Sequence, residues 1–209
     1  DIVVLEVGIG GRLDATNIIK NTLVSAITSI SFDHVEMLGN TLSEIAAEKA
    51  GIIKPGGVTV CYPKQEPEAL AQIMQRCGEK ENRLIIPNSA EILSMNISGS
   101  DIVYGGEKYH IPLMGEHQVY NTLVVIEVCS ALREYDILVS RENIRSGIAK
   151  TNFPARLELL NDSPIVILDG AHNLSGAQTL EKALVLLGER NIHGVIGMVE
   201  EKDVDGVLK

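Results

Sequence analysis

The sequence predicts an α/β protein in which the strands of parallel sheets alternate with helices. Short, almost continuous apolar runs such as Ile2–Val7 and Val24–Ile30 are typical of strands buried on both faces of a parallel sheet. Segments with a helical repeat come between such runs, and this alternation is the pattern of α/β folds. Residues 82–114 instead form short alternating segments divided by Asn, Ser and Gly-Gly, which predicts a small antiparallel excursion.

The elements follow from local signals taken in order along the chain. A glycine cluster from Gly8 to Gly11 ends the first strand, and the Thr41-x-x-Glu44 capping box begins a helix that Gly51 ends. Later helices are expected where apolar residues recur at helical spacing, and later strands where short apolar runs stand between turn residues. The expected helices are Thr41–Ala50, Glu66–Cys77, His117–Glu134, Ser140–Lys150 and Ser175–Leu187. The expected later strands are Val58–Cys61, Leu84–Ile86, Glu91–Ile97, Asp101–Tyr104, Lys108–Ile111, Ile165–Leu168 and Val195–Val199.

Composition indicates a folded chain with a sizeable core. Eighteen basic and 28 acidic residues give a net charge of −10 over 209 residues, and hydrophobic residues make up 45%. The hydrophobic content argues against disorder, because it is sufficient to build a core. The negative net charge argues against a general nucleic-acid binder, because the electrostatic field of the protein would repel phosphates. No apolar run is long enough for a membrane span, and the three cysteines fit neither a disulfide framework nor a CxxC metal site. We therefore expect a cytoplasmic protein with neither nucleic acid nor membrane as partner.

Both ends of the chain suggest a fragment of a longer protein. The sequence begins inside the first expected strand at Asp1, without an initiator methionine, and stops at Lys209 soon after another strand. Residues 151–155, which contain Pro154, are the best candidate for a linker between two pieces.

Ionisable residues follow three of the expected parallel strands. Glu6 ends the first, Asp33 and His34 follow the second, and Asp169 follows Ile165–Leu168 with His172 in the same loop. Ligands bind at the carboxyl ends of parallel strands, so the three together favour a functional site, although each alone could be an ordinary loop residue. Glu6 lies in an apolar run, where a buried carboxylate needs either a metal ion or a partner such as a helix N-terminus or Arg12.

Two polar residues fall on apolar helix faces. Lys49 shares a face with Leu42, Ile45 and Ala46 at spacings i, i+3, i+4 and i+7. It could extend its charge to solvent at the helix end, or it could be a desolvated amine that acts as a nucleophile or becomes chemically modified. Asn121 shares a face with valines and needs hydrogen-bond partners, from the backbone or from a ligand.

Several common motifs are absent from the sequence or incomplete. Gly8-x-Gly10 follows a strand, but Leu13 occupies the third glycine position, which excludes a dinucleotide-binding fingerprint. No G-x-x-x-x-G-K-[ST] phosphate loop occurs, and no Ser-His-Asp or Cys-His arrangement stands out. His117 and His193 are interpreted as ordinary polar or packing residues.

Six motifs follow one another along the chain, and the longest is Glu6-Val-Gly-Ile-Gly-Gly-Arg-Leu-Asp-Ala-Thr-Asn17. The others are Ser31-Phe-Asp-His34, Glu48-Lys-Ala-Gly-Ile-Ile-Lys-Pro-Gly56, Gly115-x-His-Gln-x-x-Asn121, Arg156-Leu-Glu158 and Asp169-Gly-Ala-His-Asn173. In this order they resemble the folylpolyglutamate synthase/dihydrofolate synthase family of the Mur ligase superfamily, and the first motif is the most specific. The last two are shared more loosely with Mur ligases. The resemblance runs through almost the whole chain.

The resemblance implies a P-loop-type parallel-sheet ATPase domain at residues 1–150, a linker at 151–155, and the start of a Rossmann-like glutamate-ligase domain at 156–209. It implies an ATP-dependent ligase of folate biosynthesis and one-carbon metabolism that joins L-glutamate to a folate or dihydropteroate carboxylate through an acyl phosphate. ATP and Mg²⁺ are the implied cofactors, a monovalent cation is a further option, and we expect a monomer at full length. Because the family's phosphate loop precedes the first strand, we expect the 209 residues alone not to turn over ATP.

The resemblance also assigns roles to individual residues. Glu6 and His34 match Mg²⁺ ligands, and Lys49 matches a lysine that is carbamylated and so becomes a carboxylate-like ligand; His34 and Lys49 are the catalytic candidates. Nucleotide contacts are implied for Asn121, Arg156, Asp169 and His172, and proximity to the pterin substrate for Arg12, Leu13 and Asp14. A Mur-type peptidoglycan precursor ligase and a non-catalytic nucleotide-binding remnant are the competing hypotheses.

Overall fold

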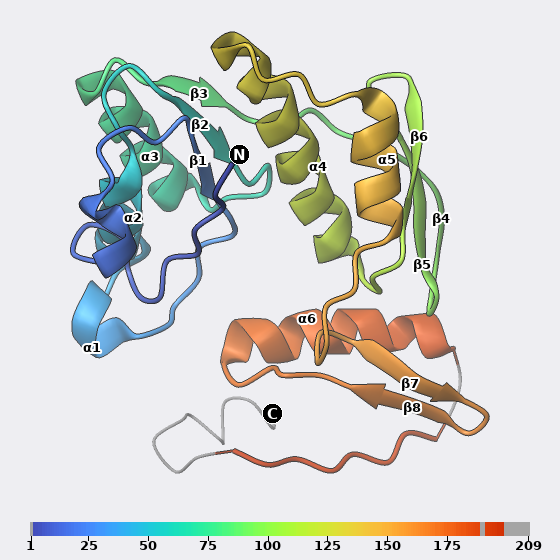
Figure 1. Ribbon diagram of the computed structural model, residues 1–209. Coiled ribbons are helices and arrows are strands. Elements are labelled where there is room, and N and C mark those ends of the chain that lie inside the picture. The colour runs from blue at the N-terminus through green and yellow to red at the C-terminus, as the bar shows by residue number, and fades with distance from the viewer. Residues whose placement is uncertain (1, 189–190, 199–209) are drawn as a thin grey trace. The chain divides into compact units, whose positions relative to one another are not determined.

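A computed structural model describes residues 2–188 and 191–198, which fold as two compact units (Figure 1). The first unit comprises residues 1–88 and 123–139, and the second comprises residues 89–122 and 140–209. Helix α4 (Glu116–Ala131) contributes residues to both. Because these units interleave along the chain, they do not test the domain boundary predicted at residues 151–155, which stays a prediction.

The first unit is built on a three-stranded parallel sheet in the order β1-β2-β3. Its strands are β1 (Val24–Ile27), β2 (Val58–Cys61) and β3 (Arg83–Ile85). The sequence placed the β3 region in the antiparallel excursion, and this was wrong. Helix α3 (Pro67–Glu79) lies between β2 and β3 in the chain, and a helical crossover returns the chain to the same end of the sheet, so the strands run parallel.

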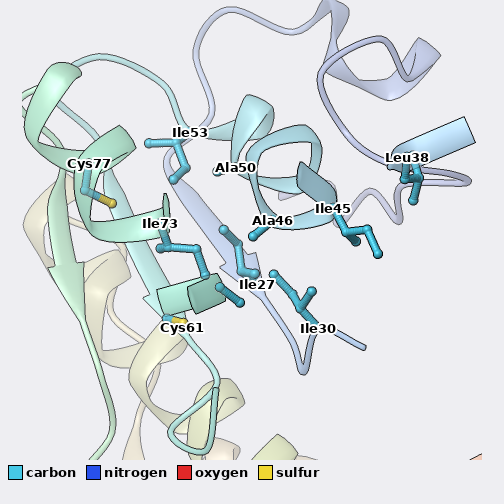
Figure 2. Close-up of a cluster of buried hydrophobic side chains, with 11 residues drawn as sticks. Ile27, Ile30, Leu38, Ile45, Ala46, Ala50, Ile53, Cys61, Ile73 and Cys77 are labelled. Carbon is cyan, nitrogen blue, oxygen red and sulfur yellow. The ribbon is translucent and has the colours of Figure 1, made fainter. Parts of the chain in front are cut away.

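Helix α2 (Leu42–Lys49) contributes Ile45 and Ala46 to the apolar core of this unit. The predicted capping box is confirmed in both halves: the Thr41 hydroxyl accepts a hydrogen bond from the Glu44 amide, and the Glu44 carboxylate accepts one from the Thr41 amide. Figure 2 shows side chains of α2 and α3, among them Ile45, Ala46 and Ile73, packed against the strands of the sheet. Short helical turns complete the unit: α1 (Val35–Leu38), η1 (Ala15–Ile18), η2 (Ala50–Ile52) and η3 (Leu132–Tyr135).

The expected first strand, Ile2–Val7, is not a strand in the structure. Its apolar side chains are exposed, with Val4 at 93% of its maximum, and no strand of the described sheets pairs with it. A buried parallel strand needs hydrogen-bonded neighbours as well as an apolar sequence, and only the second condition can be judged from the local pattern.

The second unit contains the predicted antiparallel excursion, formed by β4 (Glu91–Asn96), β5 (Gly99–Tyr104) and β6 (Glu107–Ile111). Helix α5 (Arg141–Ala149), predicted at Ser140–Lys150, packs on β6 and is capped by the side chain of Ser140. An antiparallel hairpin of β7 (Glu158–Asp162) and β8 (Ile165–Leu168) follows, and the sequence had not predicted β7. Helix α6 (Leu174–Leu184) and the turn η4 (Val185–Leu187) complete the described elements.

The strand expected at Val195–Val199 is wrong in its described part. Residues 195–198 take no regular structure and no described strand pairs with them, while Val199 lies outside the described residues. Across the described residues, every helix is too short or too polar to cross a membrane.

Candidate functional site

The glycine loop of the first unit is closed by the carboxylate of Asp14. Asp14 Oδ2 accepts the backbone N–H groups of Gly8 at 3.0 Å and Ile9 at 3.2 Å. Asp14 Oδ1 accepts the amide of Thr16 at 2.9 Å and its hydroxyl at 2.6 Å, which starts the turn η1. These bonds, with the Thr16 hydroxyl as the largest contributor, lower the pKa of Asp14 to about 2. The carboxylate is therefore committed to holding the loop.

Arg12 fastens the same loop to the end of helix α2. Its guanidinium donates to both carboxylate oxygens of Glu48, with Nη2 to Oε1 at 2.8 Å and Nε to Oε2 at 3.2 Å. Its backbone N–H donates to the Glu48 carbonyl at 2.8 Å. Glu48 raises the pKa of the guanidinium through the hydrogen bond and its charge. Leu13, between Arg12 and Asp14, projects with 81% of its surface exposed.

The three residues that match metal ligands lie on different segments of the first unit. Glu6 is exposed on the irregular segment that precedes the glycine loop, which corrects the expectation that its carboxylate is buried. His34 is also exposed and precedes α1 with a left-handed φ of 49°. The Asp33 carboxylate accepts the His34 backbone N–H at 2.9 Å and lies 3.9 Å from its Nε2. Lys49 ends α2, half-buried, beyond the packed residues Ile45 and Ala46.

The described part of the chain holds no cluster of three or more His, Cys, Asp or Glu side chains arranged for a metal ion. Mg²⁺ is usually held by one or two protein carboxylates, water molecules and substrate phosphates, so an all-protein cluster is not required. The exposed Glu6 carboxylate fits a site of this kind, and a carbamylated Lys49 would add a second oxygen ligand. The assignment of Glu6, His34 and Lys49 as ligands stays a prediction.

In the second unit, Arg156 is presented on a strained turn. Its neighbours Ala155 and Leu157 both have left-handed φ values, 57° and 50°. The Leu157 N–H donates to Asp169 Oδ2 at 2.8 Å, and the Ala155 N–H donates to Glu158 Oε2 at 2.8 Å. Leu157 is also buried in the apolar core of this unit. Such strain persists only where surrounding contacts fix it, and it concentrates at functional sites.

The loop after β8 lies against this turn. Asp169 Oδ1 accepts the Ala171 N–H at 2.8 Å, and the Gly170 N–H donates to the Ala155 carbonyl at 2.8 Å. Arg156 Nη1 lies 2.9 Å from where a Cβ on Gly170 would be, so the guanidinium passes directly over this loop. His172 is exposed, with Nδ1 3.0 Å from the Gly170 carbonyl. The structure thus brings together Arg156, Asp169 and His172.

His117, which the sequence pattern did not single out, belongs to the same cluster. Burial lowers the pKa of its imidazole, the charge of Asp169 raises it, and the charge of Arg156 lowers it. Asn121 lies one turn further along α4, on the same face at spacing i, i+4, and donates to Gln118 Oε1 at 3.1 Å. The sequence signal that could have identified His117 is its i, i+4 spacing from Asn121, a predicted nucleotide contact.

Comparison with known proteins identifies the family. The family model described as "Mur ligase middle domain" matches residues 1–129. The chain belongs to the Mur ligase family. The predicted resemblance to the folylpolyglutamate synthase/dihydrofolate synthase group is also confirmed, because the relatives carry those names. One, the dihydrofolate synthase/folylpolyglutamate synthase of Escherichia coli, is 34% identical over 209 residues, which is all of this chain and 48% of that protein.

Two solved structures of this Mur ligase group match the fold closely. An FPGS–AMPPCP–folate complex has a TM-score of 0.81 at 30% identity, over 90% of this chain and 48% of the other. The E. coli FolC structure in complex with DHPP and ADP has a TM-score of 0.80 at 32% identity, over 100% of this chain and 49% of the other. The predicted α/β class is confirmed. The chain spans about half the length of the curated relatives it matches.

Proposed function

We propose that this chain is part of an ATP-dependent ligase that joins L-glutamate to a folate or dihydropteroate carboxylate. The observation that carries the proposal is the match of the fold, over 90% and 100% of this chain, to relatives solved with a nucleotide together with folate or DHPP. The site geometry supports it, because a rigid loop with an exposed apolar tip and a strained turn bearing an arginine are both present.

In the proposed reaction, a substrate carboxylate oxygen attacks the γ-phosphorus of ATP, and ADP leaves. The α-amino group of L-glutamate then attacks the acyl phosphate carbon, loses a proton, and expels inorganic phosphate from the tetrahedral intermediate. The first step develops negative charge on the phosphoryl oxygens, and the second develops it on the tetrahedral oxyanion and then on the departing phosphate, so catalysis rests on positioning and charge neutralisation. Arg156 supplies a fixed cation for this purpose, because its turn is locked by Asp169 and Glu158.

The remaining residues divide between nucleotide and acceptor. We assign Asn121 and His172 to the nucleotide, because amide and imidazole groups can hydrogen-bond it, and Leu13 to the flat pterin ring, because its exposed side chain is apolar. Glu6, His34 and carbamylated Lys49 would hold Mg²⁺, which supplies charge neutralisation at the phosphates. We further propose a cytoplasmic monomer whose partners are these small molecules.

The test uses the protein at the length that its gene encodes. Incubation with ATP, Mg²⁺, L-glutamate and dihydropteroate or tetrahydrofolate should give glutamate-dependent ADP release and a product with one added glutamyl residue by mass spectrometry. Arg156→Gln should abolish turnover, whereas Arg133→Gln, a matched arginine outside the cluster, should not. ADP release only with a UDP-sugar peptide acceptor would favour the peptidoglycan ligase instead. If no ADP is released with any of these acceptors, the result would favour the non-catalytic remnant.

A further inference from the structure

We propose that Arg12 and Glu48 act as positioning residues that fix the glycine loop to the lysine-bearing end of helix α2. This assignment rests on the proposed function and changes the role that the resemblance gives to Arg12, which would not itself contact the substrate. The substrate contact falls instead to the neighbouring exposed tip at Leu13.

The first observation is that Glu48 accepts hydrogen bonds from Nε and Nη2 of Arg12 and from its backbone N–H. The guanidinium edge formed by Nε and Nη2 faces the carboxylate in a two-pronged pair, at 3.0, 3.2 and 2.8 Å. The Arg12 N–H is bonded to the carbonyl of the same glutamate. Paired hydrogen bonds of this geometry fix orientation as well as distance. An arginine held this way has the same edge unavailable for a substrate carboxylate.

The second observation is close backbone packing beside the pair. A Cβ on Gly11 would lie 2.9 Å from the carbonyl oxygens of both Glu48 and Lys49, and a Cβ on Gly51 would collide with Arg12. Glycine at both positions lets the loop lie directly on the end of the helix. A displacement of the loop would therefore push on the backbone of Lys49 itself.

The third observation is that the far side of the loop is fastened to the same helix end. Asn17 Nδ2 donates to the carbonyls of Arg12 at 3.0 Å and Gly51 at 3.2 Å. Lys54 Nζ in turn donates to Asn17 Oδ1 at 2.6 Å and to its carbonyl at 3.1 Å. The segment carrying Leu13 and Asp14 is thus tied down at both ends.

Together these contacts couple the proposed pterin contact to the proposed metal-binding lysine. Leu13 lies one residue beyond the Arg12 pair, and Lys49 lies one residue beyond Glu48. Glu48 has only 24% of its side chain exposed, so its carboxylate is held beside the loop and away from most solvent. The Arg12–Glu48 pair fixes the position of Leu13 relative to Lys49. A residue that only contacted the substrate would not do this.

A double-mutant cycle distinguishes positioning from direct contact. The variants are Arg12→Gln, Glu48→Gln and their combination, with Arg83→Gln as the control because Arg83 pairs with the exposed Glu134 elsewhere in this unit. The readouts are the folate dissociation constant of the full-length protein and amide hydrogen exchange at Arg12 and Asn17. Each single variant should weaken folate binding roughly two- to tenfold, and the combination should be no weaker than either.

Direct contact predicts a different result: Arg12→Gln would still weaken folate binding in the Glu48→Gln background, and this would overturn the assignment. The rates of amide hydrogen exchange at Arg12 and Asn17 provide an independent test. Arg12→Gln and Glu48→Gln should both accelerate exchange of the two amides, and unchanged exchange would also overturn it. If the wild-type protein binds no folate at all, the proposed substrate fails, while accelerated exchange in the variants would still support the coupling of loop and helix.

Discussion

Replacing Gly115 by alanine should destabilise the second unit and disturb the cluster around Arg156, for two separable reasons. Gly115 has a φ of 101°, a region that residues with a side chain rarely adopt. A Cβ there would also lie 2.7 Å from Cε1 and 2.8 Å from Nδ1 of His117. The backbone strain should cost about 1–3 kcal/mol and the overpacking a further ~1–3 kcal/mol. The sum predicts a loss of about 2–6 kcal/mol in the free energy of unfolding.

The two contributions can be measured separately. Urea unfolding of Gly115→Ala, His117→Ala and the double variant gives the coupling between the two sites. In the double variant the steric part vanishes while the backbone strain remains. The double variant should therefore be more stable than the sum of the single effects by about 1–3 kcal/mol. Strictly additive effects would show that the imidazole does not lie against residue 115.

A ligand readout extends the same experiment to function. The alanine at residue 115 should push the imidazole away from its place near Asp169 and Arg156, and so weaken binding of ADP to the full-length protein. Ala149→Gly, in the neighbouring helix α5, changes a residue outside the cluster and should leave ADP affinity unchanged. Unaltered ADP affinity in a folded Gly115→Ala variant would refute the placement of His117 beside the nucleotide contacts.

Three further predictions follow from the site and the core. Asp14→Asn should loosen the glycine loop. Folding lowers the pKa of Asp14 from 3.8 to about 2, so its carboxylate stabilises the loop fully above pH 3.8. This stabilisation should disappear as the pH falls towards 2, and NMR titration of the Gly8 amide would detect the loss. The native pKa of His117 lies below 6.5, so the free energy of unfolding should fall as the pH drops below 6.5, and a flat profile identical to that of His117→Gln would contradict this. Ile73→Ala, at a fully buried position in the core of Figure 2, should cost about 2–5 kcal/mol by calorimetry, and a loss below 1 kcal/mol would contradict the packing.

The sequence predicted elements well where the signal is local. The capping box at Thr41, strand β2 and the excursion β4–β6 depend on residues within a few positions of one another, and the structure confirms them. Ile2–Val7 and β3 failed for another reason. Whether an apolar run forms a strand, and in which direction it pairs, depends on neighbours far away in sequence.

The same limit explains the outcome for the site. Arg156, Asp169 and His172 were predicted separately, and the structure brings them together through contacts that no spacing rule contains. His117 was dismissed because a single histidine on a helix usually packs as an ordinary polar residue. Its significance comes from Asp169 and Arg156, which lie about 40 to 50 residues away in the chain and reach it only through folding.

Asp14 and Asp169 use the same physical device in the two units. Each carboxylate accepts backbone N–H groups on both oxygens: Gly8, Ile9 and Thr16 for Asp14, and Leu157 and Ala171 for Asp169. A carboxylate that accepts backbone N–H groups on both oxygens fixes the backbone of the turn it holds. Leu13 and Arg156 lie on these two turns, and both are exposed. Asp14→Asn and Asp169→Asn should therefore change the conformation of the loops. Leu13→Ala and Arg156→Gln should instead weaken ligand binding and leave the loops intact.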